Sequence, residues 1–138
     1  MTVYAEDIEI GHSASYERTV TEKDIALFGE ATGDMNPVHF DEAYAATTPF
    51  KTRIAHGMLT AGFFSTVLGT KLPGAGSIYV SQTLAFKAPV RIGDTVVATC
   101  TVTAKEKRRV TLRCEAKVGD TLVAEGEAML LAPGRPKG

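Results

Sequence analysis

Residues 95–118 constrain the fold most, because apolar and polar side chains alternate along them with a period of two. The apolar positions are Val96, Ala98, Cys100, Val102 and Ala104, then Val110, Leu112, Cys114, Ala116 and Val118. Such alternation predicts two antiparallel strands, 95–104 and 109–118, each with one face in a core and one in water. A hairpin centred near Lys107 would place Cys100 opposite Cys114, where both are expected to be buried free thiols.

Turn signals extend this sheet in both directions. Gly119-Asp120 predicts a tight turn into a further strand over residues 121–131, and Gly93-Asp94 leads into residues 95–104. Residues 77–87 form an earlier strand, and one leading strand precedes the helical part of the chain. The sequence therefore predicts a five-stranded antiparallel sheet.

The first half of the chain predicts helices. Thr21 and Asp24 resemble an N-cap pair for a helix of roughly residues 22–32, and Gly33 stands where a helix often ends. The apolar stripe of this helix would be Ile25, Phe28 and Ala31. A short helix is expected near residues 41–46.

Residues 57–69 predict a longer helix, closed by Pro73-Gly74. Its apolar side chains cover nearly all faces, which is typical of a buried helix. One long helix against a curled antiparallel sheet is a two-layer α+β arrangement. We expect residues 1–138 to form a single domain, with 133–138 as a frayed tail.

Composition narrows the function classes. Hydrophobic residues make up 44% and charged residues 22%, and the formal net charge is -1. We therefore expect no nucleic-acid partner and no anionic membrane partner. The longest apolar stretch is far shorter than the about 20 residues that cross a bilayer, and the first residues do not resemble a signal peptide. Two cysteines make no disulfide framework, so a cytoplasmic location is the expectation.

The segment 31–39 (ATGDMNPVH) brings a carboxylate, Asp34, and an imidazole, His39, within five residues. Because Pro37 disfavours helical geometry at Asn36, this spacing is expected in a turn and not on one helix face. A compact turn can aim Asp34 and His39 at one water molecule. Carboxylates and imidazoles are the groups that exchange protons with water near neutral pH.

Two other interpretations of this segment stay open. Asp and Asn after a helix-ending glycine often only hydrogen-bond the turn, which is the more frequent role of such a motif taken alone. A metal site of Asp34, His39 and His56 is a third alternative, which we rank low because no pair has helical ligand spacing.

A second segment, residues 55–58 (AHGM), precedes the long helix. Gly57 would offer an unhindered backbone N–H at a helix start, which can stabilise negative charge on a carbonyl oxygen. His56 is expected to be a helix-entry residue that hydrogen-bonds the backbone, in preference to a catalytic group. Ser65 is either bonded back to the helix or a pocket hydroxyl near the substrate.

These segments resemble the MaoC-like, (R)-specific enoyl-CoA hydratases, the hydratase-2 group that includes the PhaJ enzymes. The likeness covers residues 28–45 (FGEATGDMNPVHFDEAYA), continues through 54–58 (IAHGM) and 86–90 (FKAPV), and spans essentially the whole chain. One departure is Ala31, where a larger aliphatic residue is more common. The resemblance implies a hot-dog fold, in which the sheet wraps the central helix, and a homodimer or higher homo-oligomer.

The resemblance also implies the reaction, hydration of a trans-2-enoyl-CoA to an (R)-3-hydroxyacyl-CoA and its reverse. Asp34 and His39 would activate the water, and the Gly57 N–H would form the oxyanion hole. Asn36 would hold the loop, while Ser65 and His56 would lie beside the catalytic pair. No metal and no cofactor are implied, since CoA enters only with the acyl-CoA substrate.

Three rival functions stay open: a 3-hydroxyacyl-ACP dehydratase on the same fold, a hot-dog acyl-CoA thioesterase and a non-catalytic acyl-thioester binding module. Short-chain substrates and a place in fatty acid metabolism or polyhydroxyalkanoate supply are expected from the resemblance. Side chains that could line an acyl tunnel, although each is more often plain core, are Phe63, Phe64, Leu68 and Met129.

Overall fold

The computed structural model describes residues 1–137. A 3-10 turn, η1, opens the chain at Ala5–Asp7. The helices are α1 (Glu22–Thr32), α2 (Pro37–Phe40), α3 (Glu42–Ala45) and α4 (Gly57–Thr70). The strands are β1 (Ser13–Thr19), β2 (Ile78–Gln82), β3 (Ala85–Phe86), β4 (Thr95–Glu106), β5 (Arg109–Val118) and β6 (Thr121–Leu131).

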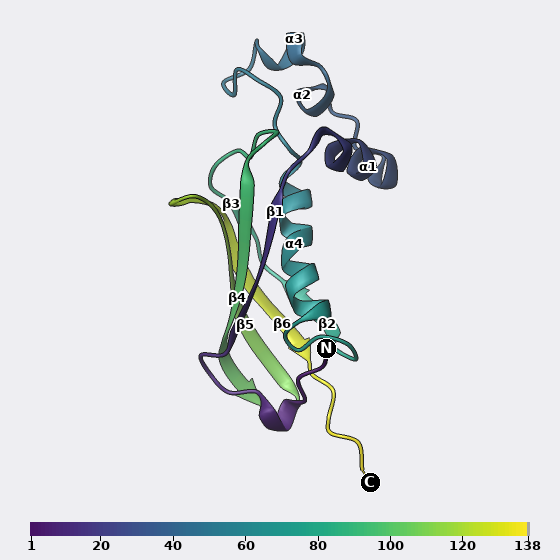
Figure 1. Ribbon diagram of the computed structural model, residues 1–138, viewed down its shortest axis with the longest axis vertical. Coiled ribbons are helices and arrows are strands. Elements are labelled where there is room, and N and C mark those ends of the chain that lie inside the picture. The colour runs from purple at the N-terminus through teal and green to yellow at the C-terminus, as the bar shows by residue number, and fades with distance from the viewer. Residues whose placement is uncertain (138) are drawn as a thin grey trace.

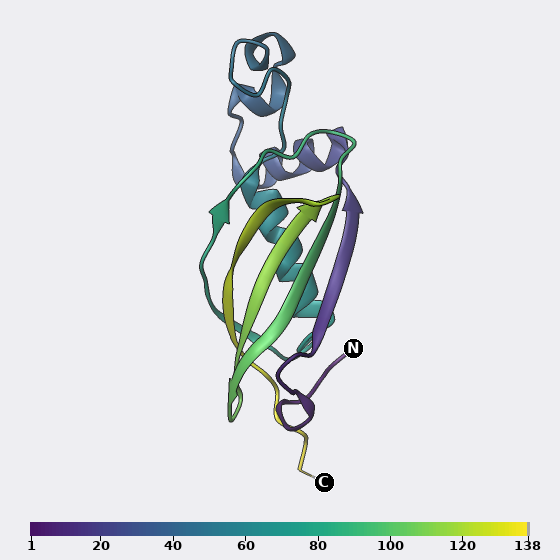
Figure 2. The same cartoon turned by 90° about the vertical axis from the view of Figure 1, so that its left-hand side faces the viewer.

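One antiparallel sheet carries the fold, with the strand order β1-β4-β5-β6-β2 and with β3 paired to β6. The sheet curves around α4, which runs along its inner face (Figures 1 and 2). Helices α1 to α3 gather at one end of the sheet, and both chain termini lie at the other end (Figure 1). This is the predicted α+β hot-dog arrangement.

The predicted strand over residues 77–87 is present as two segments, so the sheet has six strands by count. The break lies at Thr83, whose hydroxyl accepts a hydrogen bond from the Glu127 N–H at 3.0 Å. The Thr83 N–H still donates to the Glu127 carbonyl at 2.9 Å. The Thr83 hydroxyl thus replaces a main-chain carbonyl as the acceptor of one hydrogen bond between the strands. Regular pairing with β6 resumes at Ala85.

The β4–β5 hairpin has the predicted register, with Cys100 directly opposite Cys114. Both cysteines are buried and free, and their sulfurs lie 3.5 Å apart. The alternation fails at one predicted position, Ala104, which is exposed. A register shift between Val102 and Ala104 turns the end of the strand over.

Helix α1 begins and ends as predicted. The Thr21 hydroxyl accepts from the Asp24 N–H, and the Asp24 carboxylate accepts from the Thr21 N–H, each at 3.1 Å. Gly33 ends the helix at φ 79°, a conformation that glycine adopts without strain. The predicted apolar stripe is wrong at Ala31, which is exposed. Only the earlier turns of α1 face the rest of the protein, where Ile25 and Gly29 are buried.

Helix α4 forms the centre of the core, but the prediction that it is buried on nearly all sides is wrong within one chain. Phe64, Val67 and Leu68 are fully buried against the sheet. Because the sheet covers only one side of the helix, a stripe at helical spacing is exposed. It consists of Met58, Gly62, Ser65 and Gly69.

The C-terminal segment differs in one respect from the predicted frayed tail. The Pro133 carbonyl accepts from the Ala5 N–H at 2.9 Å, and the Arg135 N–H donates to the Glu6 carboxylate. The start of the predicted frayed tail is therefore tied to η1, while Gly138 lies outside the described residues. Among residues 1–137, none of the helices has the length and apolar character needed to cross a membrane.

Candidate active site

The segment between α1 and α2 brings Asp34 and His39 together in a way that the sequence only partly predicts. Asn36 is non-helical (φ -53°, ψ 126°), and its side chain accepts from the Val38 N–H at 3.1 Å. Pro37 then starts the short helix α2, because its fixed φ suits a first helical position. His39 thus lies on a helical turn and not in an open loop, whereas Asp34 lies in the turn before it.

His39 is buried, with 8% of its surface exposed. Its Nδ1 lies 2.7 Å from the Ile54 carbonyl, which can only accept, so Nδ1 carries the proton. The other nitrogen, Nε2, is left with a lone pair. Burial lowers the pKa of His39 below its ordinary value, and the neighbouring His56 lowers it further. The Ile54 carbonyl and the Asp34 charge act in the opposite direction. A neutral His39 is therefore favoured, ready to accept a proton.

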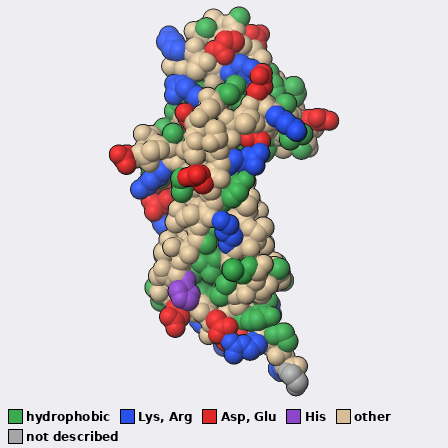
Figure 3. Space-filling view, viewed as in Figure 1, with side chains coloured by type: hydrophobic (Ala, Val, Ile, Leu, Met, Phe, Trp, Pro, Cys, Tyr) green, Lys and Arg blue, Asp and Glu red, His purple; other side chains and the backbone are tan. Residues whose placement is uncertain are grey.

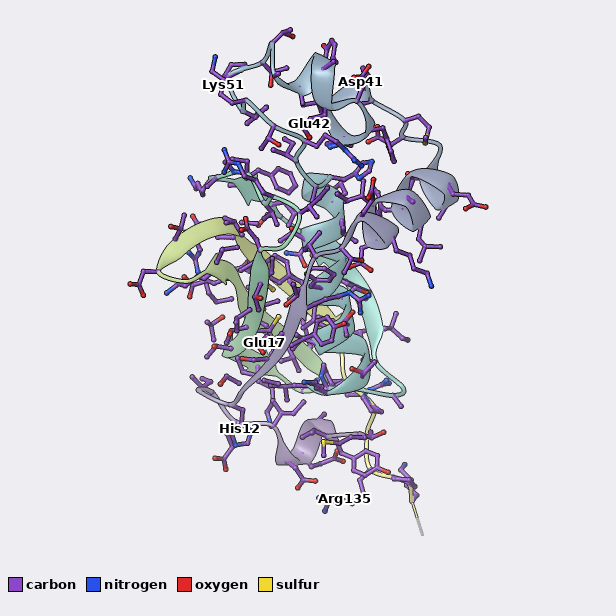
Figure 4. The ribbon with its side chains drawn as sticks, turned by 45° about the horizontal axis from the view of Figure 1, so that its top comes forward. His12, Glu17, Asp41, Glu42, Lys51 and Arg135 are labelled. Carbon is purple, nitrogen blue, oxygen red and sulfur yellow. The ribbon has the colours of Figure 1, made fainter. Side chains whose placement is uncertain are left out.

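Arg53 holds the backbone of His39 from behind. Its Nε donates to the His39 carbonyl at 2.7 Å, and its guanidinium pairs with Glu22 of α1 at 2.8 Å. Glu42 of α3 accepts hydrogen bonds from the Thr52 hydroxyl and the Arg53 N–H. The segment 37–51, which contains α2 and α3, projects beyond the sheet, and Figure 4 labels Glu42 and Lys51 on it. Charged side chains are spread over the surface of this end of the molecule (Figure 3). Arg53 is thus the side chain that joins His39 to α1.

His56, the residue before α4, is almost fully buried, at 2% exposure. Its Nε2 lies 2.9 Å from the main-chain carbonyl of Asp34, so Nε2 carries the proton. The His39 and His56 rings stack with centroids 3.9 Å apart. The prediction that His56 enters the helix and hydrogen-bonds the backbone is confirmed.

One polar atom from each of Asp34, His39 and His56 lies within 4.8 Å of the others. A water that hydrogen-bonds two groups at about 2.8 Å each can bridge such a gap. The same three side chains are the donor set of the alternative metal site. In each ring one nitrogen hydrogen-bonds a carbonyl and the other is free, which is compatible with a shared water and with a metal ligand alike. The absence of a metal therefore stays a prediction.

Gly57 is the first residue of α4, so its N–H has no partner within the helix. The Phe86 ring of β3 packs on it so closely that an added Cβ would lie 2.9 Å from Phe86 Cε1. Only glycine leaves both the N–H and the ring in place. Gly57 is therefore well placed to offer a hydrogen-bond donor at the wall of the site.

A cavity of about 420 Å³ joins these groups. Its wall includes Asp34, His39, His56 and Gly57, and otherwise consists mainly of apolar side chains from the loops before α4 and after β3, with a few from α4, β3 and β6. The structure thus brings four predicted site residues to one cavity, and Asn36 holds the turn beside it. An apolar cavity with a few convergent polar groups is the usual form of a small-molecule site.

Other predicted residues do not reach this cavity. Ser65 lies on the exposed stripe of α4, eight residues after Gly57, which corresponds to about 12 Å along the helix. Phe63, Phe64 and Leu68 are buried in the core and do not line the cavity. Ser65 therefore has no place in the site of a single chain, and its role stays a prediction.

Three side chains at the site were not predicted from the sequence to belong to it: Arg53, Phe86 and Thr60. Phe86 and Thr60 line the cavity, and Arg53 supports His39. Each acts through a contact between distant segments, which periodicity and short motifs do not encode. The pairing of β3 with β6, which brings Phe86 over Gly57, could not be predicted.

Comparison with known proteins shows the family of this chain. The chain is 59% identical to an (R)-specific enoyl-CoA hydratase of Rhodospirillum rubrum over 134 residues, 96% of this chain and 93% of the relative. It is 50% identical to a 3-hydroxybutyryl-CoA dehydratase of Methylorubrum extorquens, covering 95% of this chain and 85% of the relative. The solved (R)-hydratase of A. caviae, involved in PHA biosynthesis, superimposes with a TM-score of 0.90 at 41% identity, covering 93% and 99%. Residues 5–124 match the MaoC-like domain family, and the chain belongs to that family.

Proposed function

We propose that this protein is a hydro-lyase that adds water reversibly to a trans-2-enoyl-CoA and forms an (R)-3-hydroxyacyl-CoA. The observation that carries the proposal is the placement of Asp34 and His39 within 4.8 Å, beside the free N–H of Gly57 in one apolar cavity. The (R) stereochemistry is supported by the name of the R. rubrum relative.

Asp34 and His39 bracket one water in this reaction. The water oxygen bonds to Cβ of the enoyl thioester, and one of the pair takes its proton. A proton is delivered to Cα from the same side, so the addition is syn. The thioester oxygen gains negative charge as the enolate forms, and the Gly57 N–H stabilises it. The neutral His39, with Nε2 unprotonated, has the protonation state that water activation needs.

The loss of enoyl thioester absorbance with crotonyl-CoA tests this function. We expect Asp34→Asn and His39→Gln each to lower kcat by about 10²–10⁴-fold, which is the usual contribution of a general acid or base. His12→Gln is the matched control, because His12 is exposed at the far end of the molecule (Figure 4). Full activity in both site variants would overturn the assignment.

The substrate is a short-chain acyl-CoA in this proposal, in keeping with the names of the relatives. A profile of kcat/KM from four-carbon to twelve-carbon enoyl-CoA measures the chain length. The same series with substrates on acyl carrier protein separates the hydratase from a 3-hydroxyacyl-ACP dehydratase. Release of free thiol without hydration would identify a thioesterase, and binding without turnover a binding module.

The protein acts as a homodimer, in which a second copy covers the edge of the sheet at β2. Consecutive side chains of a strand point to opposite faces, yet Ile78, Tyr79 and Val80 are 54%, 41% and 53% exposed. Both faces of this edge strand are thus uncovered, and the exposed stripe of α4 is a second uncovered surface of the same chain. Such apolar edges favour pairing with another chain.

Sedimentation of Val80→Asp tests the dimer, and we expect a monomer. Ile10→Asp is the matched control, because Ile10 is 70% exposed just before β1, at the opposite edge of the sheet. A Val80→Asp protein that sediments like the wild type would contradict this interface.

The reaction requires no metal and no redox cofactor in this proposal, and CoA enters only as part of the substrate. Activity that survives exhaustive treatment with a chelator would support this. A cytoplasmic location and a role in fatty acid metabolism or polyhydroxyalkanoate supply also belong to the proposal. The supply role rests on the A. caviae hydratase named above.

A further inference from the structure

Two buried polar atoms next to the catalytic pair have no hydrogen-bond partner among residues 1–137: Nδ1 of His56 and Oγ1 of Thr60. Both residues are 2% exposed. Leaving a buried polar atom without a hydrogen-bond partner is costly, and native proteins rarely do so. These two atoms therefore call for a common explanation.

The two residues are neighbours on one helix face. His56 immediately precedes α4 and Thr60 follows four residues later, which places their side chains one above the other. Helical side chains lean toward the helix N-terminus, so the Thr60 side chain leans toward His56. Because Nε2 of His56 donates to the Asp34 carbonyl, Nδ1 of the neutral ring is a bare acceptor. The Thr60 hydroxyl can donate one hydrogen bond, which is what Nδ1 lacks.

We propose that Thr60 is a positioning residue whose hydroxyl donates to a bridging water, which in turn donates to Nδ1 of His56. This bond fixes the His56 tautomer with its proton on Nε2. That tautomer holds the Asp34 carbonyl, and the same ring stacks on His39. Thr60 thus acts on both members of the catalytic pair without touching the reacting atoms.

Thr60→Val tests the proposal, because valine keeps the shape and removes the hydroxyl. Thr60→Ser restores the hydroxyl. Thr66→Val is the matched control on the same helix, where the lost hydroxyl bonds only the Gly62 carbonyl at 3.3 Å. The readout is the ¹⁵N resonance of the His56 ring nitrogens, which is readily assigned since the chain has 3 histidines and His56→Gln removes one set of signals.

In Thr60→Val we expect the Nδ1 resonance of His56 to move toward that of a nitrogen that accepts no hydrogen bond. Thr60→Ser and Thr66→Val should resemble the wild type. We also expect kcat to fall about tenfold in Thr60→Val with KM unchanged, as is typical for one hydrogen bond. An unchanged Nδ1 resonance in folded Thr60→Val, or an equal change in Thr66→Val, would overturn the proposal.

The kinetic part rests on the proposed hydratase function, but the resonance does not. If the wild type fails to hydrate any enoyl thioester, the proposed function fails while the ¹⁵N result still decides the hydrogen bond. If the wild type is active and the resonance does not move, the Thr60 inference fails alone.

Discussion

The imidazole rings of His39 and His56 stack 3.9 Å apart, at an angle of 28° between their planes. Phe28 and Phe40 pack against the His56 ring, with centroids 4.6 and 5.7 Å away. Each imidazole donates from one nitrogen to a main-chain carbonyl, His39 to Ile54 and His56 to Asp34. The stack therefore places two imidazoles, each with one assigned donor nitrogen, in a setting of aromatic side chains.

The first prediction concerns how the activity falls as the pH becomes acidic. The proposed reaction uses a neutral His39, whose pKa lies below the ordinary value of 6.5 mainly because of burial. We therefore expect kcat/KM for crotonyl-CoA hydration to reach half of its plateau value only below pH 6.5. A rate that halves above pH 6.5, with the protein still folded, would contradict this.

The same lowered pKa predicts how stability depends on pH. Below about pH 6.5 the unfolded chain protonates this histidine more than the folded protein does, so the unfolded state binds more protons. The free energy of unfolding should therefore decrease as the pH falls from 6.5 through the folded pKa of His39. Urea unfolding at pH 7 and pH 5 measures this, and His39→Gln should show a smaller decrease than the wild type.

Gly57→Ala should abolish most of the activity. The new methyl group would lie 2.9 Å from the Phe86 ring, so either the ring or the start of α4 has to move. We expect kcat to fall at least about 10²-fold, comparable to the loss of an oxyanion-hole donor. Gly57→Ala with Phe86→Ala relieves the collision, and partial recovery of kcat in the double variant would assign the loss to Phe86. A fully active Gly57→Ala would show that the N–H position is not critical.

Arg53 should matter for catalysis more than for folding. Arg53→Gln removes the donor to the His39 carbonyl together with the ion pair to Glu22. Glu22→Gln removes only the ion pair, in which the Glu22 side chain is 71% exposed, so its effect should be small. We expect kcat to fall about tenfold in Arg53→Gln with little change in KM, and to stay near the wild-type value in Glu22→Gln. Equal kcat losses would assign the effect to the ion pair.

Asp24 should stabilise the protein without acting in the reaction. Its buried carboxylate accepts from the Thr21 N–H and from Arg18, and the Arg18 guanidinium is the main cause that lowers the pKa of Asp24. Asp24→Ala should lower the free energy of unfolding by about 1–2 kcal/mol, the range for a lost helix cap. For a lowered carboxyl pKa the stabilisation is full above the unfolded pKa of about 3.9. It disappears as the pH falls through the folded value. Urea unfolding across this range measures both effects.

The strands and the capped helix could be predicted because their signals are local. The alternation over residues 95–118 fixed which side chains face the core, and Cys100 and Cys114 lie opposite each other as the hairpin required. Thr21, Asp24 and Gly33 mark the ends of α1 because capping involves residues close in sequence. The Asp34–His39 pair was also found because five residues separate its members.

The rest depends on contacts between distant segments. Helical geometry alone places Ser65 two turns away from Gly57. The number of residues between them therefore explains why Ser65 does not reach the cavity of its own chain. In contrast, nothing near Arg53 in sequence indicates that it hydrogen-bonds the His39 carbonyl. The exposed stripe of α4 was predicted to be buried. An amino-acid sequence does not distinguish a surface that its own chain covers from a surface that a second chain could cover.

The tie between His56 and Asp34 runs through the main-chain carbonyl of Asp34 and not through its carboxylate. The Asp34 carboxylate does accept the Asn36 N–H at 3.3 Å, and the amide oxygen that Asp34→Asn introduces can accept it equally. Chemistry and architecture are therefore separable at this residue. An Asp34→Asn enzyme should keep its pocket intact while its turnover is nearly stopped, which makes it a substrate trap. Crystals of that variant soaked with an enoyl-CoA could capture the unreacted complex and show directly how the thioester lies against the start of α4.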